Sequence, residues 1–354
     1  MGRFCGRGSL LCLAAPASHD PAMNRDRYRG CLLGQALGDA LGFAVEGQPA
    51  QVCSLQVQAL REGRPLRREP FSFGQYTDDT QLARELALSL ADCNGFDPVD
   101  HARRLAAMFT EHRIVGRGKA TENAARRLAA GVPWNEAGEP PPQAGNGSSM
   151  RAAPVGLWCH ADPRELVRVA VDQGRTTHRD QRASAGAVAI AGAVALALRG
   201  EEANGAGRTL DAAAFCRTLA AWVGGVDAGF GEAVAALPRS VAVDPLLALS
   251  TIQSSGKDFD DRWPGISPFV VGSVMWSLYA FLREPDDFEA AMVLAIGVGG
   301  DVDTTAAMTG AIVGARLGAA ALPRKLVRKL QDQGAWRHGD LSKLADRLHA
   351  VRGS

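Results

Sequence analysis

The sequence predicts an all-α protein built as a single domain. Apolar residues recur at three- and four-residue spacing along most of the chain after Arg27, which is the pattern of helices that bury one face. Alternating runs of Val, Ile and Thr, which would indicate strands, are scarce. No polar linker is long enough to divide the 354 residues. We therefore expect a domain over residues 23–350, preceded by a disordered extension over residues 1–22.

The helical pattern is clearest in eight segments. They are residues 81–91, 98–110, 123–130, 163–171, 184–198, 210–223, 269–282 and 286–296. The apolar run over residues 183–198 is too short for a membrane span and contains Gly186 and Gly192, so it is expected to be a buried core helix. Two segments rich in Gly and Pro, residues 131–148 and 254–268, are expected to be functional loops.

Composition limits the partners that the protein can have. The net charge is +1, so bulk electrostatics predict neither a nucleic-acid nor a membrane-surface partner. The seven cysteines are scattered, odd in number and without a CxxC pair. A reducing compartment, and hence a cytoplasmic location, is the simpler expectation for such a chain. We expect it to be a monomer.

Two clusters of acidic and hydroxyl residues precede predicted helices. The first acidic cluster is Thr77-Asp78-Asp79 and the second is Asp301-Val302-Asp303-Thr304. Either one alone could be explained as a helix cap with acidic residues in the first turn. Together they hold more oxygen atoms than two caps need, and four packed carboxylates would repel one another without a cation. An all-oxygen ligand set suits Mg²⁺, Mn²⁺ or Ca²⁺ and not Zn²⁺.

The helix that follows the second cluster is expected to pack closely against its neighbours. Gly310, Gly314 and Gly318 recur every four residues, and alanines lie beside them. Such a surface lets another helix approach closely, although each helical glycine costs about 1 kcal/mol relative to alanine. A closely packed helix would be a rigid platform for a site at its N-terminus.

Five motifs occur in an order that is typical of one family. They are Arg29-Gly30-Cys31-Leu32-Leu33-Gly34-Gln35-Ala36-Leu37-Gly38-Asp39-Ala40-Leu41-Gly42 with Glu46; Tyr76-Thr77-Asp78-Asp79-Thr80; Gly145-Asn146-Gly147-Ser148-Ser149-Met150-Arg151-Ala152-Ala153-Pro154; Thr177-His178; and Gly299-Gly300-Asp301-Val302-Asp303-Thr304. In these residues the chain resembles the ADP-ribosylglycohydrolase family over about residues 27–323.

The resemblance implies an orthogonal helical bundle with two Mg²⁺ or Mn²⁺ ions in a central cleft. The metal ligands that it implies are Thr77, Asp78, Asp79, Asp301, Asp303 and Thr304. The substrate-binding residues that it implies are Asn146, Gly147, Ser148, Met150 and His178. The catalytic carboxylate could be Glu46, Asp79 or Asp303.

Several of these residues also have simpler interpretations. Ser148 could be an N-cap after a glycine-rich turn, although backbone N–H groups there could equally bind a pyrophosphate. His178 could be a capping or packed residue, and Glu46 a solvated loop residue. Asp39, on an apolar helix, needs a partner if it is buried, either as support for a metal ligand or as a structural hydrogen-bonding group.

The chain departs from the family pattern at two places. Some members have a second His shortly after Thr-His, whereas here Arg179-Asp180 follows. Some members carry an Asp just before the turn that is residues 115–118 here, and this has been proposed as a base. The nearest carboxylate in this chain is Glu111. These departures leave the base, and with it the substrate, open.

The expected reaction is metal-dependent hydrolysis of the glycosidic bond between ADP-ribose and an acceptor. The acceptor would be arginine or another protein side chain, and release of ADP-ribose would reverse mono-ADP-ribosylation. Alternatives are a hydrolase of another ADP-ribosyl compound, such as an ester or O-acetyl-ADP-ribose, and a non-catalytic ADP-ribose-binding protein. A two-metal phosphoesterase is an unrelated alternative that would release AMP.

Overall fold

The chain folds almost entirely into α-helices. The computed structural model describes residues 21–200, 203–204, 209–254 and 263–352. The helices of its first half are α1 (Pro21–Phe43), α2 (Ala50–Arg61), α3 (Asp78–Cys93), α4 (Pro98–Thr110), α5 (Lys119–Ala129), α6 (Ala153–Cys159), α7 (Pro163–Arg175) and α8 (Gln181–Arg199). Those of its second half are α9 (Ala212–Gly224), α10 (Ala228–Val241), α11 (Pro245–Ser254), α12 (Val270–Arg283), α13 (Phe288–Gly297), α14 (Val302–Leu317), α15 (Arg324–Val327) and α16 (His338–Arg352). The predicted all-α class is confirmed.

Other regular structure in these residues is short. Two 3₁₀ helices, η1 (Asn146–Ser148) and η2 (Ala319–Ala321), interrupt the loops. Strand β1 (Gln48–Pro49) pairs antiparallel with β4 (Gly299–Gly300). Strand β2 (Ala203–Asn204) pairs antiparallel with β3 (Thr209–Leu210). Each pairing is only two residues long, so neither forms an extended sheet. The β1–β4 pairing matters because it holds the segment after α1 beside the segment before α14.

Capping residues explain where the predicted helix ends were right and where they were not. Helix α4 has the predicted bounds, with Asp97 as its N-cap. Helix α3 begins three residues before the predicted start, because Thr77 caps it and the acidic first turn carries no apolar signal. Helix α1 already begins at Pro21, so the extension predicted over residues 1–22 is wrong at its last two residues. Its remainder, residues 1–20, lies outside the described residues.

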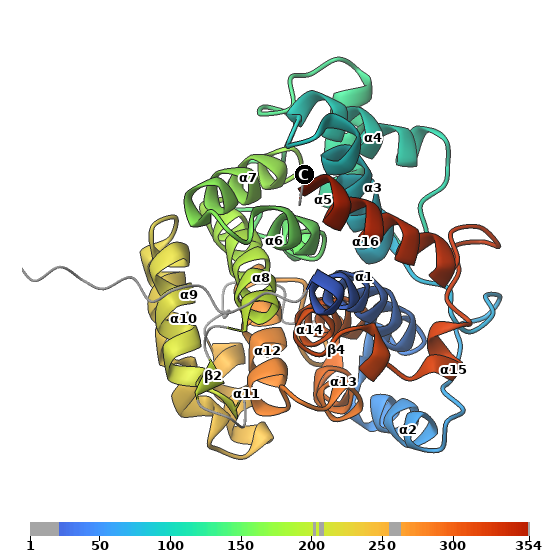
Figure 1. Ribbon diagram of the computed structural model, residues 1–354, viewed down its shortest axis with the longest axis vertical. Helices are drawn as coiled ribbons and strands as arrows, with labels where there is room; N and C mark the ends of the chain where they lie inside the picture. The colour runs from blue at the N-terminus through green and yellow to red at the C-terminus, as the bar shows by residue number, and fades with distance from the viewer. Residues whose placement is uncertain (1–20, 201–202, 205–208, 255–262, 353–354) are drawn as a thin grey trace, which may run out of the picture.

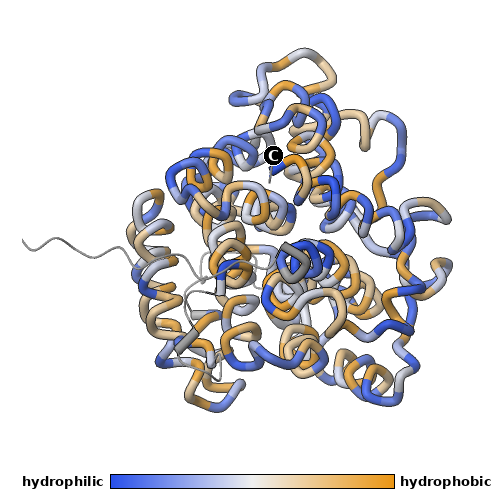
Figure 2. The backbone as a smooth tube through the Cα atoms, in the orientation of Figure 1, coloured by the Kyte–Doolittle hydropathy of each residue, from blue (hydrophilic) through white to orange (hydrophobic). Residues whose placement is uncertain are grey.

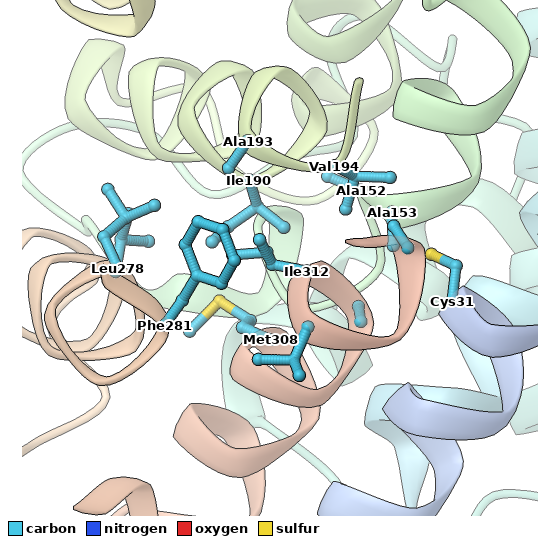
Figure 3. Packing of buried hydrophobic residues seen from close by; sticks show 14 of the residues in the cluster. Cys31, Ala152, Ala153, Ile190, Ala193, Val194, Leu278, Phe281, Met308 and Ile312 are labelled. Carbon is cyan, nitrogen blue, oxygen red and sulfur yellow. The ribbon is translucent and has the colours of Figure 1, made fainter. Parts of the chain in front are cut away.

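The apolar core lies between helices that are far apart in the sequence. Figure 1 shows α1 and α14 side by side near the centre, with α8, α12 and α13 around them and α9 and α10 at one edge. Hydrophobic and hydrophilic residues alternate along most helices in Figure 2, as expected when one face of a helix is buried. Figure 3 shows Ile190 of α8, Phe281 of α12 and Ile312 of α14 meeting in this core.

Helix α8 is the buried core helix that the sequence predicted. With 19 residues, Gln181–Arg199, the helix is long enough and apolar enough on average to cross a membrane by length and composition alone, but 89% of its apolar window is buried inside the protein. Small residues dominate it, and Gly186 and Gly192 lie directly against side chains of neighbouring helices. The helix therefore buries its apolar surface against the protein itself.

Glycine-to-glycine contacts set the distance between α1 and α14. A Cβ added to Gly310 would overlap the carbonyl oxygen of Gly34, and one added to Gly34 would overlap that of Gly310. Gly30 and Gly314 meet in the same way. Gly42, at the end of α1, lies against the backbone of Asp303. The predicted close packing is confirmed, and it holds the N-terminus of α14 against the end of α1.

Gly310→Ala is expected to lower the free energy of unfolding by about 1–3 kcal/mol, because the added methyl overlaps backbone that cannot give way. Gly272→Ala in α12 is the matched control, since a Cβ there would meet nothing within 4 Å. That control should leave the stability unchanged or raise it by up to about 1 kcal/mol. Urea unfolding followed by circular dichroism measures both. Equal stability of the two variants would contradict the close-packing argument.

Candidate active site

A cavity of about 660 Å³ opens where the N-terminal ends of α3 and α14 meet. Its wall is formed by Glu46, Asp78, Asp79, Gly116, Arg117, Gly118, Lys119, Ala120, Thr121, Gln143, Gly145, Asn146, Gly147, Met150, His178, Trp263, Pro268, Asp301, Asp303 and Thr304. Carboxylates of both acidic clusters are therefore at one site, although more than 200 residues separate them in the sequence.

The first acidic cluster is held by Asp39 of α1. The fully buried carboxylate of Asp39 accepts hydrogen bonds from the backbone N–H and hydroxyl of Thr77 at 3.0 and 2.9 Å. It accepts two more from the N–H and hydroxyl of Thr80 at 3.1 and 2.6 Å. Burial raises the pKa of Asp39 to about 7, because its effect is larger than the opposite effect of the hydrogen bonds from Thr77 and Thr80. Asp39 thus fixes the first turn of α3, and the hydroxyl of Thr77 points to Asp39 behind the cavity wall.

The second acidic cluster is not explained by capping. Asp301 occupies the N-cap position of α14 but makes no side-chain cap hydrogen bond. Its Oδ2 instead accepts a hydrogen bond of 2.6 Å from the amide of Asn146. Asp303 accepts one from the backbone N–H of Thr304 at 2.9 Å. A carboxylate that serves as a cap would be directed at the helix backbone, so the side chain of Asp301 has another use.

Glu46 reaches the same site through the β1–β4 pairing. The N–H of Gly47 donates to the carbonyl of Gly300 at 2.8 Å, which holds the loop of Glu46 beside Asp301. Gly300 has φ of +87°, and a Cβ there would overlap the backbone of Ile266. The side chain of Glu46 is 31% exposed and accepts a hydrogen bond from Arg68 at 2.8 Å. Gly299 and Gly300 thus permit the close approach of three chain segments: their own, the one at Gln48–Pro49 and the one at Ile266.

Burial and mutual repulsion raise the pKa values of these carboxyl groups. Desolvation raises the pKa of Asp78 to about 7, and the charge of Asp39 adds to the effect. Desolvation likewise raises the pKa of Asp301 to about 7. The pKa of Asp79 and that of Asp303 are raised well above their usual range by burial first and by neighbouring carboxylates second. The group therefore needs either protons or a cation to be stable.

The donor set fits a hard divalent cation. Glu46, Asp301 and Asp303 each place one carboxylate oxygen within 4.8 Å of the others. The Oδ1 atom of Asp79 is buried and has no hydrogen-bond partner in the described part of the chain. All of these donors are oxygen atoms, as Mg²⁺ and Mn²⁺ prefer.

The loop around η1 contributes to the cavity wall, though not through every residue that was predicted. Asn146, Gly147, Met150 and His178 line the cavity. Ser148 does not line it: its hydroxyl is buried and donates to the carbonyl of Ala183 at 2.9 Å. The expectation that the Ser148 side chain binds substrate is therefore not supported, because the 3₁₀ turn directs it into the protein. A contact from Ser148 would have to come from its backbone.

Comparison with known proteins identifies the family. The family model described as ADP-ribosylglycohydrolase matches residues 20–354. This chain belongs to the ADP-ribosylglycohydrolase family. A solved structure titled "ADP-ribosylglycohydrolase-related protein complex" superposes with a TM-score of 0.66 at 30% identity, over 94% of this chain and 99% of that one. The predicted glycohydrolase fold is confirmed.

Two relatives illustrate the activities named in this family. ADP-ribosylhydrolase ARH3 of Gallus gallus is 29% identical over 98% of this chain and 98% of its own length. ADP-ribosylarginine hydrolase Tri1 of Pseudomonas putida is 28% identical over 93% of this chain and 79% of its own length. These similarities support an ADP-ribosyl hydrolase activity, so the chain is a glycohydrolase enzyme.

The glycohydrolase cavity also contains residues that sequence reasoning missed as site residues. Those with polar or aromatic side chains that could contact a ligand include Arg117, Lys119, Gln143 and Trp263. Arg117 belongs to the turn before α5, and Lys119 is the first residue of that helix. A hydrogen bond of 2.7 Å from the Asp78 N–H to the Val115 carbonyl fixes the turn beside the acidic residues. A glycine-rich turn before a helix was the available signal. Gln143 and Trp263 lie in the two segments, residues 131–148 and 254–268, that were predicted to be functional loops, although the sequence did not indicate which residues of those loops line the cavity.

Neither of the two departures from the family pattern has a substitute group in the cavity among the residues that the structure describes. Glu111 is exposed, pairs with Arg113 at 2.8 Å and does not line the cavity. Arg179 donates to the carbonyl of Gly138 at 3.0 Å, and Asp180 caps α8. Glu111 is therefore not a replacement for the missing Asp, and in the described parts of the chain the carboxylates that line the cavity are those of Glu46 and the acidic clusters.

Proposed function

We propose that this enzyme catalyses the metal-dependent hydrolysis of the glycosidic bond between ADP-ribose and a protein side chain, releasing free ADP-ribose. Arginine is the favoured acceptor, so the reaction reverses mono-ADP-ribosylation. The observation that carries the proposal is the convergence of the two acidic clusters and Glu46 on one cavity. Packed carboxylates of this kind are unfavourable unless they bind a cation, and hard cations bind carboxylate oxygen.

The acidic clusters supply the residues that would hold two Mg²⁺ or Mn²⁺ ions. Asp78, Asp79, Asp301 and Asp303 offer carboxylate oxygens, and Thr304 lies beside them on the cavity wall. Thr77 donates its hydroxyl proton to Asp39 and accepts a hydrogen bond from the Asp79 N–H, which leaves one lone pair of its oxygen for a cation. When bound, such ions supply charge neutralisation and orient the ribose hydroxyls and water.

Glu46 is the favoured general base. It lines the cavity and is half-buried, whereas Asp79 and Asp303 are almost completely buried among other carboxylates. In the proposed step a water oxygen bonds to the anomeric carbon of the distal ribose as the bond to the guanidine nitrogen breaks. A proton of that water passes to Glu46, which then releases it to solvent, and the leaving nitrogen takes up one proton from solvent, so the products are ADP-ribose and arginine.

The turn before α5 and the first residues of this helix suit the negative charge of the phosphates in the proposed substrate. Arg117 and Lys119 lie at the start of α5, where backbone N–H groups and the helix dipole also favour an anion. A pyrophosphate there would lie near the acidic residues, because the turn before α5 contacts them: a Cβ on Gly116 would lie 2.8 Å from Asp78 Oδ1. The cavity thus offers carboxylates that can hold cations and, beside them, cationic side chains that suit the phosphates.

Purified protein incubated with arginine-, serine- and O-acetyl-linked ADP-ribose, with Mg²⁺, Mn²⁺ or EDTA, tests the proposal by mass spectrometry. We expect release of intact ADP-ribose from the arginine conjugate with either metal and none in EDTA. Release of AMP would instead identify a phosphoesterase. Binding of the conjugates without turnover in the presence of metal would identify a non-catalytic ADP-ribose-binding protein. Turnover of the O-acetyl ester alone would contradict arginine as the acceptor, but the enzyme would still be a hydrolase of ADP-ribosyl compounds.

A further inference from the structure

Arg151 is a completely buried cation held by neutral groups. Its guanidinium donates to Gln173 Oε1 at 2.8 Å and to the backbone carbonyls of Gly147 and Gln173 at 2.8 Å each. It also donates to the hydroxyls of Thr176 and Thr177 at 3.2 and 2.8 Å. Within the described ranges no carboxylate pairs with it. Burying an unpaired cation is costly, so this arrangement calls for an explanation beyond stability.

The hydrogen bonds around Arg151 determine where the proton of His178 lies. A guanidinium can only donate, so the Thr177 oxygen accepts from Arg151 and has one proton left to give. Two acceptors are within reach: His178 Nδ1 at 2.9 Å and the Gly174 carbonyl at 3.4 Å. The shorter contact favours His178, so Nδ1 accepts and the neutral ring carries its proton on Nε2.

The Nε2 side of the ring lies at the cavity. His178 belongs to the cavity wall, and Nε2 has no hydrogen-bond partner in the parts of the chain that the structure describes. A Cβ on Gly145 would lie 3.1 Å from Nε2, and one on Gly147 would lie 2.8 Å from Cε1. These two glycines therefore leave the room that the imidazole fills.

The ring cannot easily turn away from this position. The N–H of Glu139 donates to the carbonyl of Thr177 at 2.9 Å, and the N–H of Arg179 donates to the carbonyl of Glu139 at 2.8 Å. These bonds fix the backbone on both sides of His178. Burial first, and the charge of Arg151 second, lower the pKa of His178 to about 3, so the ring is neutral at physiological pH.

We propose that Arg151 is a positioning residue which, through Thr177, holds His178 in the Nε2–H form and so presents one fixed hydrogen-bond donor to an acceptor oxygen of the bound ADP-ribosyl group. The identity of the ligand as an ADP-ribosyl group rests on the proposed function, whereas the position of the proton on His178 does not. The other neutral tautomer would direct a lone pair at that oxygen and repel it. Arg151 does not line the cavity, and its effect on the position of the His178 proton passes through the hydroxyl of Thr177.

The proton position can be measured directly on the full-length protein labelled with ¹⁵N-histidine. A long-range ¹H–¹⁵N correlation spectrum distinguishes the two neutral tautomers, and the signals that disappear in His178→Gln assign the residue among the seven histidines. We expect a protonated Nε2 and an unprotonated Nδ1 in the wild type. A protonated Nδ1 would overturn the proposal, and this result needs no variant of Arg151 or Thr177.

Thr177→Val and Thr177→Ser form a matched pair for the functional consequence. Valine removes the hydroxyl and is expected to mix the tautomers and weaken ADP-ribose binding about tenfold in calorimetry. Serine keeps the hydroxyl and should retain the wild-type tautomer and an affinity within about twofold. In turnover of the arginine conjugate, Thr177→Val should raise KM by a larger factor than that by which it lowers kcat.

The outcomes separate this proposal from the proposed function. Equal affinity of the valine and serine variants, with a changed tautomer in valine, would overturn the role of the fixed donor. If the wild-type protein has the expected tautomer but does not bind ADP-ribose, the assignment of ADP-ribose as the ligand is contradicted, and with it the proposed function.

Discussion

Asp303→Ala is expected to abolish turnover of ADP-ribosylarginine while the far-UV circular dichroism of the protein stays unchanged. Asp303 is 4% exposed, lines the cavity and belongs to the carboxylate group of Glu46 and Asp301. Loss of a group that holds a catalytic cation removes several kcal/mol of transition-state stabilisation, which corresponds to a fall of about a thousandfold or more in kcat/KM. Steady-state kinetics with Mg²⁺ and Mn²⁺ measures the effect.

The stability of the same variant distinguishes a metal ligand from a structural residue. Because burial and neighbouring charges raise the pKa of Asp303 well above its usual range, its carboxyl group is unfavourable in the metal-free protein. Asp303→Ala should therefore leave the metal-free melting temperature unchanged or raise it, and the increase on adding metal should disappear. A helix-capping role would instead lower the stability by about 1 kcal/mol.

Glu111→Ala is the control for this experiment. Glu111 is also a carboxylate near the site in sequence, but it is exposed and pairs with Arg113 outside the cavity. We expect wild-type kinetics from this variant. Full activity of Asp303→Ala in EDTA would contradict the metal proposal, and inactivity of Glu111→Ala would contradict the assignment of the catalytic groups to the cavity.

The metal-free protein is expected to lose stability as the pH rises from about 4 to above 7. Asp39, Asp78 and Asp301 have folded-state pKa values raised to about 7, and the pKa values of Asp79 and Asp303 are also raised well above their usual range. In the unfolded chain these groups release their protons near pH 4. Between these values the folded state binds more protons than the unfolded state, so the free energy of unfolding falls as the pH rises.

Divalent cations should reverse this trend. They bind the ionised carboxylates, so the melting temperature with Mg²⁺ or Mn²⁺ should exceed that in EDTA by an amount that grows from pH 5 to pH 8. At a metal concentration of about 1,000 times Kd, the increase should be on the order of 5 °C for a chain of this length. Thermal melts at several pH values, with NaCl at matched ionic strength as the control, measure the difference. A difference independent of pH would indicate that the carboxylates do not bind the ion.

The sequence alone determined the class of fold and most helix positions. Helical periodicity and capping are local properties, so a window such as residues 98–110 contains what is needed to predict α4. The glycine spacing at Gly310 and Gly314 likewise predicted close packing of α14. The two acidic clusters were recognisable because each holds more carboxylates than one helix cap requires.

Only the tertiary structure decided which of these groups meet, and in what orientation. Asn146 was predicted to bind substrate, yet its amide donates to Asp301, 155 residues away in the chain. Ser148 is adjacent to the cavity in sequence but bonds to Ala183, and Arg117 reaches the cavity without a recognised motif. The direction of a side chain depends on partners brought close by packing, and neither periodicity nor spacing records those partners. The residue types at the site could therefore be predicted from the sequence, whereas their hydrogen bonds, burial and protonation could not.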